Sequence, residues 1–199
     1  MTHPAFQTLL GEARSAHAVH PELAAFAPFP DDVADSAFTP HHIPAATLMA
    51  QDTGLFSAQW QSFRDAFVTA GPHAHWRETY KGTDIGQRFL DQFGCYSLVG
   101  PDAPYTSEKL YAFVVYMPAG LYYPWHHHPA EEIYLILAGE AEFMRKGEPS
   151  EVLQAGDTSF HKSNQPHAMQ THDHPVLAYV TWRNHLNIRP VLSAPGDLP

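Results

Sequence analysis

A spaced set of histidine, glutamate and glycine residues in the second half of the chain constrains its fold more than any other feature. The set follows the spacing G-x5-H-x-H-x3-E-x6-G and consists of Gly120, His126, His128, Glu132 and Gly139. Successive side chains of a β-strand point to opposite faces, so His126 and His128 should project together while His127 points away. By the same alternation, Tyr134 should share a face with Glu132. The spacing therefore predicts a strand, a turn at Pro129-Ala130, and a second strand that brings a carboxylate and a phenol beside two imidazoles.

Two imidazoles and a carboxylate in this arrangement can bind one divalent metal ion. A fourth ligand would come from further along the chain, where a second pattern, G-x5-P-x-G-x2-H-x3-N, is matched at Gly156 and His167. The other positions of this pattern differ, so His167 is the expected ligand and His161 is its competitor. The chain is therefore expected to be a metalloenzyme.

The composition limits the class of protein and its partners. The chain has 199 residues, of which 44% are hydrophobic and 16% charged, so we expect one globular domain with a substantial core. Its formal net charge of -10 argues against binding to a nucleic acid backbone. The single cysteine, Cys95, excludes an intramolecular disulfide. The sequence has neither a signal peptide pattern nor an apolar stretch of about 20 residues, so we expect a cytoplasmic protein that does not enter a membrane.

The periodicity of the apolar residues changes near residue 94. Helical spacing occurs at Pro4–Ala16, Leu55–Ala70 and Ile85–Phe93, with proline-rich connections at 21–30 and 38–44. Strand patterns occur at 95–99, 110–117, 133–138, 141–145, 158–160 and 176–182, with a turn expected at 138–140. Short strands with frequent turns favour a small barrel or sandwich. The sequence thus predicts a helical region over residues 1–93 that packs on a β-barrel formed by residues 94–199.

The two motifs resemble those of the cupin family over about residues 95 to 185. The first motif matches fully and the second in part. The resemblance implies a mostly β fold, the double-stranded β-helix barrel, which holds a divalent metal ion. The implied ligands are His126, His128, Glu132 and His167. Three imidazoles and one carboxylate suit Fe(II), Zn(II), Mn(II), Co(II) or Ni(II), and the sequence leaves open both the metal and whether His126 binds it directly.

A longer stretch, from Tyr122 to Tyr134, is similar to the cupin-type dimethylsulfoniopropionate lyases, especially their DddQ group, with the DddL group next. The resemblance implies cleavage of dimethylsulfoniopropionate (DMSP), a small zwitterionic sulfonium, to dimethyl sulfide and acrylate. It also implies functional roles for Tyr123 and Tyr134 in addition to the four expected ligands.

The implied reaction is a β-elimination, in which a base removes a proton next to the substrate carboxylate and dimethyl sulfide leaves. A metal ion bound to that carboxylate would stabilise the charge that develops. A tyrosine can act as the base, because a nearby divalent cation favours the phenolate. Tyr123 is the favoured base, and Tyr134 would then lie beside the metal. Aromatic faces attract a sulfonium by about 0.5 to 2 kcal/mol each, and the candidates are Trp125, Trp182, Tyr179 and Phe143.

Three other functions would use the same fold. A cupin Fe(II) dioxygenase would use the same ligands and consume oxygen, whereas a metal-dependent isomerase would use the metal and a base without losing a group. A ligand sensor would need no base, so the two tyrosines argue against it. Oxygen consumption on addition of a substrate separates the dioxygenase from the lyase.

Overall fold

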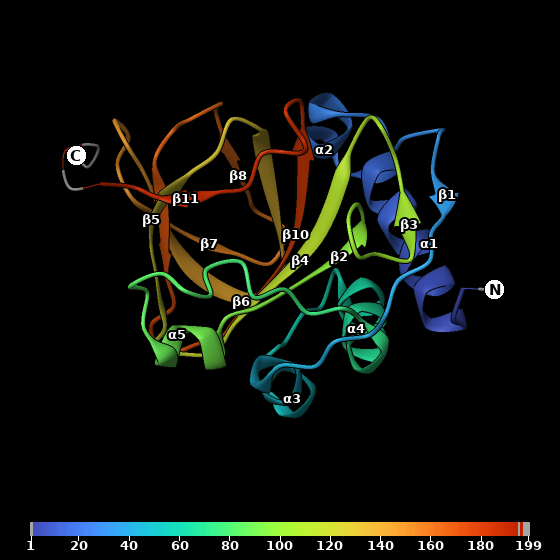
Figure 1. The fold of residues 1–199 in the computed structure, drawn as a ribbon, viewed down its shortest axis with the longest axis horizontal. Helices are drawn as coiled ribbons and strands as arrows, with labels where there is room; N and C mark the ends of the chain where they lie inside the picture. The colour runs from blue at the N-terminus through green and yellow to red at the C-terminus, as the bar shows by residue number, and fades with distance from the viewer. Residues whose placement is uncertain (1, 195, 197–199) are drawn as a thin grey trace.

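The computed structural model describes residues 2–194 and 196, and it consists of a helical part followed by a β-rich part (Figure 1). The helices are α1 (Pro4–Val19), α2 (Pro21–Phe26), α3 (Pro44–Gln51), α4 (Gln61–Ala70) and α5 (Gln87–Gln92), with a 3-10 turn η1 (Gly71–His73). The strands are β1 (Ala34–Asp35), β2 (Gly94–Val99), β3 (Tyr105–Thr106), β4 (Tyr111–Met117), β5 (Tyr122–His127), β6 (Glu131–Arg145), β7 (Glu151–Gln154), β8 (Thr158–His161), β9 (His167–Gln170), β10 (Val176–Arg183) and β11 (Val191–Leu192). The expected mostly β fold with an N-terminal helical region is confirmed.

Strand β6 organises the barrel, because its two halves pair with different neighbours. The strand order is β1-β3-β2-β4-β10-β6-β9-β5-β11, and β7 and β8 also pair with β6. The first half of β6 lies antiparallel to β8 and β10, and its second half lies antiparallel to β7 and β9. Two antiparallel layers therefore share one long strand and enclose an apolar interior, as expected for a double-stranded β-helix.

Gly139 lies inside β6, where the sequence predicted a turn between two strands. Its φ angle is 68°, a left-handed conformation that glycine adopts without a steric penalty. A Cβ atom added at this position would lie 1.7 Å from the carbonyl oxygen of Pro175. The backbone thus bends and passes close to the segment before β10 without reversing, and the two predicted strands form one strand of 15 residues.

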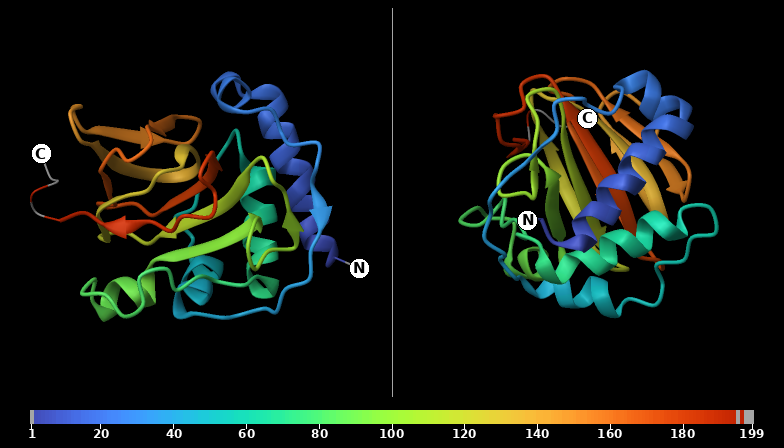
Figure 2. Two further views of the ribbon diagram at one scale, coloured as in Figure 1. Left: turned by 45° about the horizontal axis from the view of Figure 1, so that its top comes forward. Right: turned by 90° about the vertical axis from the view of Figure 1, so that its right-hand side faces the viewer.

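Helices α1, α3 and α4 cover the outer face of the sheet (Figure 2). Phe63 and Phe67 of α4 stack with a ring separation of 5.0 Å, and both contact Tyr179 of β10, at 5.1 and 6.1 Å. Leu9 of α1 and Leu135 of β6 are fully buried in the same core. The helical part therefore packs on the barrel through one continuous apolar layer.

The helical part differs from the sequence prediction in the start of one helix and in the presence of two further helices. Helix α4 begins at Gln61, not at Leu55, because the chain first turns where the Trp60 N–H donates to the Ser57 hydroxyl at 2.9 Å. The proline-rich connection at 21–30 contains α2, and α3 begins at Pro44, the last residue of the connection at 38–44. In each of these helices a proline occupies the first turn, where its missing N–H removes no helical hydrogen bond.

Residues from before Gly94 also fill part of the barrel interior. Tyr80, Phe89 and Phe93 are buried in the same cluster as the inward-facing side chains of β5, β6 and β10. Phe89 and Phe93 stack at 4.7 Å, and both pack on Tyr123, at 5.3 and 4.6 Å. Side chains from the first part of the chain therefore complete the interior of the barrel. The division of the chain into two units at residue 93 stays a prediction.

Within residues 2–194 and 196, no helix is both long and apolar enough to cross a membrane.

Candidate metal centre

Three donor side chains meet in the barrel interior, and they come from three neighbouring strands. His128 directly follows β5, Glu132 lies on β6, and His167 begins β9. The pairing of β9 with both β5 and β6 brings them together. One ligand atom from each residue lies within 4.8 Å of the others, and all three side chains are buried. In the described part of the chain, this is the one group of such donors that could hold a metal ion.

Backbone carbonyls orient the imidazole rings of His128 and His167 by accepting hydrogen bonds from their Nδ1 atoms. Nδ1 of His128 donates to the Ala130 carbonyl at 2.9 Å, and Nδ1 of His167 donates to the Gln165 carbonyl at 2.8 Å. Nε2 is therefore the ring nitrogen that each histidine can offer to a metal ion. Both Nε2 atoms are buried without a hydrogen bond and lie 3.4 and 3.2 Å from Glu132 Oε2. Two imidazole nitrogens this close to a carboxylate fit a divalent cation between the three groups, and bonds from Nδ1 to a carbonyl are typical of metal-binding histidines.

Glu132 is oriented by two further donors. The Trp182 indole N–H donates to Oε1 at 2.6 Å, and His161 Nδ1 donates to Oε2 at 2.8 Å. Burial alone would raise the pKa of Glu132, yet His128 and the surrounding imidazoles hold this pKa well below its usual range. The carboxylate is therefore ionised, and one of its oxygens faces the imidazole nitrogens.

His161 uses both of its ring nitrogens for hydrogen bonds. Nδ1 donates to Glu132, and Nε2 accepts from the Ser159 hydroxyl at 3.0 Å. Burial lowers the pKa of His161 to about 3, so its ring is neutral. A neutral ring with both nitrogens engaged offers no lone pair to an ion, and this favours His167 over His161 as the ligand.

His126 lies against His167, with ring centroids 4.1 Å apart, but it is not part of the group of donors that meet within 4.8 Å. Its Nδ1 donates to the Pro124 carbonyl at 2.9 Å, and its ring stacks on Tyr123 at 4.0 Å. Burial lowers the pKa of His126 well below its usual value. This histidine thus has a ligand's protonation state, and its direct binding to a metal stays a prediction.

Both predicted catalytic tyrosines face the interior. Tyr123 and Tyr134 are buried, and burial raises the pKa of each well above its usual value. The Tyr123 hydroxyl lies 2.8 Å from the hydroxyl of Tyr80, which is also buried. Tyr80 was not among the predicted residues, because it lies in an irregular segment between η1 and α5 that carries no motif.

A cavity of about 30 Å³, here called the inner cavity, opens beside the metal centre. Its lining includes Tyr123, Glu132, Tyr134 and Trp182. It has room for about two water molecules, so a larger ligand needs some outward movement of the lining. An outer chamber of about 350 Å³ adjoins it. The residues that line both spaces, here called the neck, are Arg77, Thr79, Phe113 and Trp182.

Two of the four aromatic residues expected to bind a sulfonium lie inside the barrel. Trp182 lines the inner cavity, and its ring lies 4.2 Å from that of His128. Phe143 is fully buried beside Tyr134, with ring centroids 5.4 Å apart, and does not line the inner cavity. Trp182 is therefore the candidate with access to a substrate.

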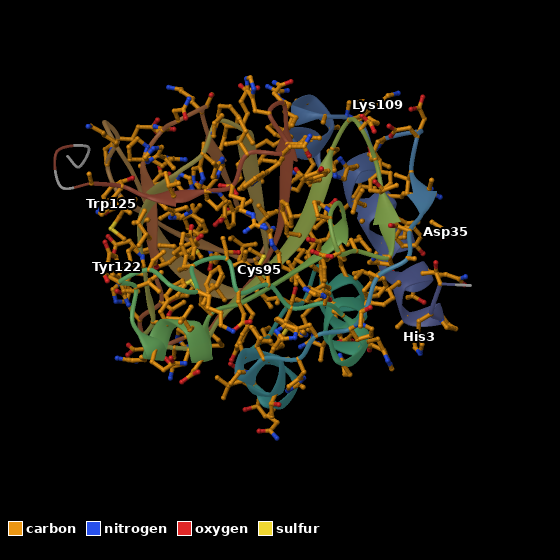
Figure 3. All side chains as sticks on the ribbon, in the orientation of Figure 1. His3, Asp35, Cys95, Lys109, Tyr122 and Trp125 are labelled. Atoms are coloured by element: carbon orange, nitrogen blue, oxygen red, sulfur yellow. The ribbon has the colours of Figure 1, made fainter. Side chains whose placement is uncertain are left out.

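The other two candidates lie elsewhere. Trp125 is half-buried on β5, at the end of the molecule opposite α1 (Figure 3). The assignment of Tyr179 to the pocket was wrong, because its side chain points to the outer face and is covered by α1 and α4. There its hydroxyl lies 3.2 Å from His17 Nε2. Alternation along β10 places Tyr179 and Trp182 on opposite faces of the strand.

His127, which was expected to point away from the other two histidines, does face outward, and so does Glu131 beside Glu132. Nδ1 of His127 lies 2.9 Å from the Ser193 hydroxyl, and Glu131 pairs with Arg183 at 3.0 Å. Neither residue lies in the interior cluster.

Comparison with known proteins finds similarity over nearly the whole chain. The sequence model of the family described as dimethylsulfoniopropionate lyase matches residues 19–178. Dimethylsulfoniopropionate lyase DddQ of Ruegeria pomeroyi is 51% identical over 194 residues, which cover 98% of this chain and 96% of that protein. The crystal structure of that DddQ superposes with a TM-score of 0.96 and covers 98% of both chains. A crystal structure from a study of the DMSP lyases RdDddP and RnDddQII superposes with a TM-score of 0.92 at 38% identity, covering 96% of this chain and 98% of that one.

Proposed function

This chain belongs to the dimethylsulfoniopropionate lyase family, and on that basis we propose that it cleaves DMSP to dimethyl sulfide and acrylate by β-elimination. The observation that carries the proposal is the lining of the inner cavity, which combines Tyr123 and Tyr134 with Glu132 of the metal centre. An elimination next to a carboxylate needs a strong base beside a site of positive charge. A phenol next to a cation site meets that need.

The proposed metal ligands are His128, Glu132 and His167, with His126 as the fourth. A divalent ion held there would supply positive charge to the substrate carboxylate as negative charge develops on the adjacent carbon. Trp182 and His161 keep the Glu132 carboxylate turned toward the imidazoles. Three imidazoles and one carboxylate suit several transition metals. We therefore propose that the site binds one divalent ion, which is Fe(II), Zn(II), Mn(II), Co(II) or Ni(II).

Tyr123 is the proposed general base. Its phenolate oxygen takes the proton from the carbon next to the carboxylate, and the electrons of that C–H bond form the double bond of acrylate. The C–S bond breaks, and its electron pair leaves on dimethyl sulfide. The Tyr80 hydroxyl, 2.8 Å away, can donate to the Tyr123 phenolate and so stabilise a charge that burial disfavours. Tyr134 is the alternative base, and Trp182 offers an aromatic face to the sulfonium.

The first test is to add DMSP to metal-replete protein and measure dimethyl sulfide by gas chromatography. No release above the rate of the uncatalysed reaction would contradict the proposed function. An oxygen electrode in the same experiment should record no consumption, and a stoichiometric uptake would favour the dioxygenase.

The second test concerns the base. Tyr123→Phe should keep the bound metal but lower kcat by about 10²- to 10⁴-fold, the usual contribution of a general base. Tyr134→Phe is the matched comparison, because both hydroxyls are buried in the same cavity. A near-normal rate for Tyr123→Phe together with a large loss for Tyr134→Phe would move the base role to Tyr134.

A further inference from the structure

Arg77 occupies an unusual position in the neck between the outer chamber and the inner cavity. Its backbone N–H donates to the Cys95 carbonyl at 2.8 Å, and an isolated bridge pairs the preceding Trp76 with Tyr96. Trp76 and Tyr96 pack on the helix-covered outer face, while Cys95 belongs to the interior cluster. The segment thus runs like an extra strand beside β2, and this places the side chain of Arg77 on the interior side.

The guanidinium of Arg77 is not neutralised by an acidic side chain. Its Cζ lies 4.8 Å from the centroid of the Phe113 ring, a stacking contact that holds the cation in place. Within the described residues, Arg77 forms no salt bridge, whereas Arg64, Arg145 and Arg183 each have a carboxylate partner. Partial burial removes some of the water around the Arg77 guanidinium, and no carboxylate compensates for that loss. The guanidinium therefore favours binding of an anionic ligand.

The surroundings of the neck suit a ligand with two opposite charges. Phe113 and Trp182 lie edge to face, with ring centroids 5.3 Å apart, and Trp182 also lines the inner cavity. An aromatic face therefore lies beside a cation that hydrogen-bonds the Cys95 thiol and has no carboxylate partner among the described residues. The acids of the outer chamber are Glu78, which is paired with Lys81 at 3.0 Å, and the exposed Asp102.

We propose that the Arg77 guanidinium binds the carboxylate of the substrate in the neck and makes the site selective for small molecules that carry a carboxylate. The inference rests on the proposed function, which supplies the substrate class. Arg77 acts here as a binding and specificity residue. Its planar guanidinium can form two parallel hydrogen bonds with a carboxylate, which a lysine ammonium cannot.

The test compares propionate with its uncharged analogue propionamide, because only the former carries the anionic end of DMSP. Their dissociation constants are measured by ligand-observed NMR on wild-type protein, Arg77→Gln and Arg77→Lys, each with and without added Zn²⁺. Arg77→Gln should weaken propionate binding about tenfold or more, both with and without the metal, and change propionamide binding less than about twofold. Arg77→Lys should give a smaller loss, since the charge remains and the paired geometry is lost.

Arg189→Gln is the matched control. Arg189 also lines the outer chamber, but it is exposed and lies outside the neck, so its loss should change propionate binding less than about twofold. Equal losses in Arg77→Gln and Arg189→Gln would overturn the inference, as would an unchanged ratio of propionate to propionamide affinity in both Arg77 variants. If Arg77→Gln does not fold, a wild-type propionate affinity in Arg77→Lys overturns it.

Turnover separates this inference from the proposed function. In an active enzyme, Arg77→Gln should raise KM for DMSP about tenfold and change kcat much less. If the wild-type protein releases no dimethyl sulfide, the proposed function fails while the NMR comparison still decides the role of Arg77. If the wild-type protein is active and Arg77→Gln has an unchanged KM, the inference alone fails.

Discussion

Replacing Trp182 with phenylalanine should weaken metal binding while leaving an aromatic ring in the cavity. The indole N–H donates to Glu132 Oε1 at 2.6 Å, and this contact is buried. Phenylalanine keeps a flat apolar ring near His128 but has no donor. The ionised Glu132 would lose one of the two side chains that orient it.

The size of the effect follows from the charge on the acceptor. A hydrogen bond to a charged group contributes about 1.5 to 3 kcal/mol. Since about 1.4 kcal/mol corresponds to a tenfold change in an equilibrium constant, Trp182→Phe should raise the metal dissociation constant about 10- to 100-fold. Loss of partners that orient metal ligands in other proteins has effects of the same size.

Competition with a chromophoric chelator measures the affinity for Zn²⁺, and Trp60→Phe is the matched control. The Trp60 indole is also buried, but its N–H has no hydrogen-bond partner, so the same substitution removes no bond. At saturating metal, the KM of Trp182→Phe for DMSP should change less than about threefold, because the ring that faces the sulfonium remains. An unchanged zinc affinity in Trp182→Phe, or an equal loss in Trp60→Phe, would refute this reasoning.

Three further predictions concern the metal centre, the helical layer and the long strand. His128→Ala should lose both bound metal and activity, whereas His127→Ala should keep both; stoichiometric metal in His128→Ala, measured by atomic emission, would exclude His128 as a ligand. Burial lowers the pKa of His17, so the folded state is stabilised above the ordinary pKa of about 6.5 and loses stability as the pH falls below it. Between pH 7.5 and 5.5, urea unfolding should show the wild-type protein losing up to about 1 kcal/mol more than His17→Gln; parallel pH profiles would count against this assignment. Gly139→Ala should destabilise the fold by more than about 2 kcal/mol, because its Cβ would overlap the Pro175 carbonyl oxygen, and a thermal melt within one or two degrees of wild type would contradict it.

The interior of the barrel could be predicted where strand alternation decides the outcome. Alternation put His126 and His128 on one face and His127 on the other, and the motif spacing added Glu132 to the face of the two histidines. The same rule places Tyr179 on the outer face once the position of Trp182 is known. The sequence did not show which face of β10 the helices cover, since both of its faces are apolar and buried.

Other features depend on contacts between distant parts of the chain. The Tyr80 hydroxyl meets that of Tyr123 although 43 residues separate them, and no local spacing encodes such a contact. Gly139 looked like a turn because glycine is common in turns, whereas here it permits the close approach of Pro175. Sequence patterns therefore predicted three of the donors that meet in the candidate metal centre, whereas only the folded chain shows that Tyr80 meets Tyr123 and that Arg77 lines the inner cavity.

The Tyr80–Tyr123 pair also bears on how this protein can be recombined with its relatives. A chimera that joined the barrel of one parent to the helices of another would combine hydroxyls and aromatic rings that had not evolved together. The segment from Trp76 to Phe93 supplies Arg77 to the lining of the inner cavity, and Tyr80 and Phe89 to the apolar cluster inside the barrel. A crossover point between parents is therefore better chosen ahead of Trp76 than at the apparent border near Gly94.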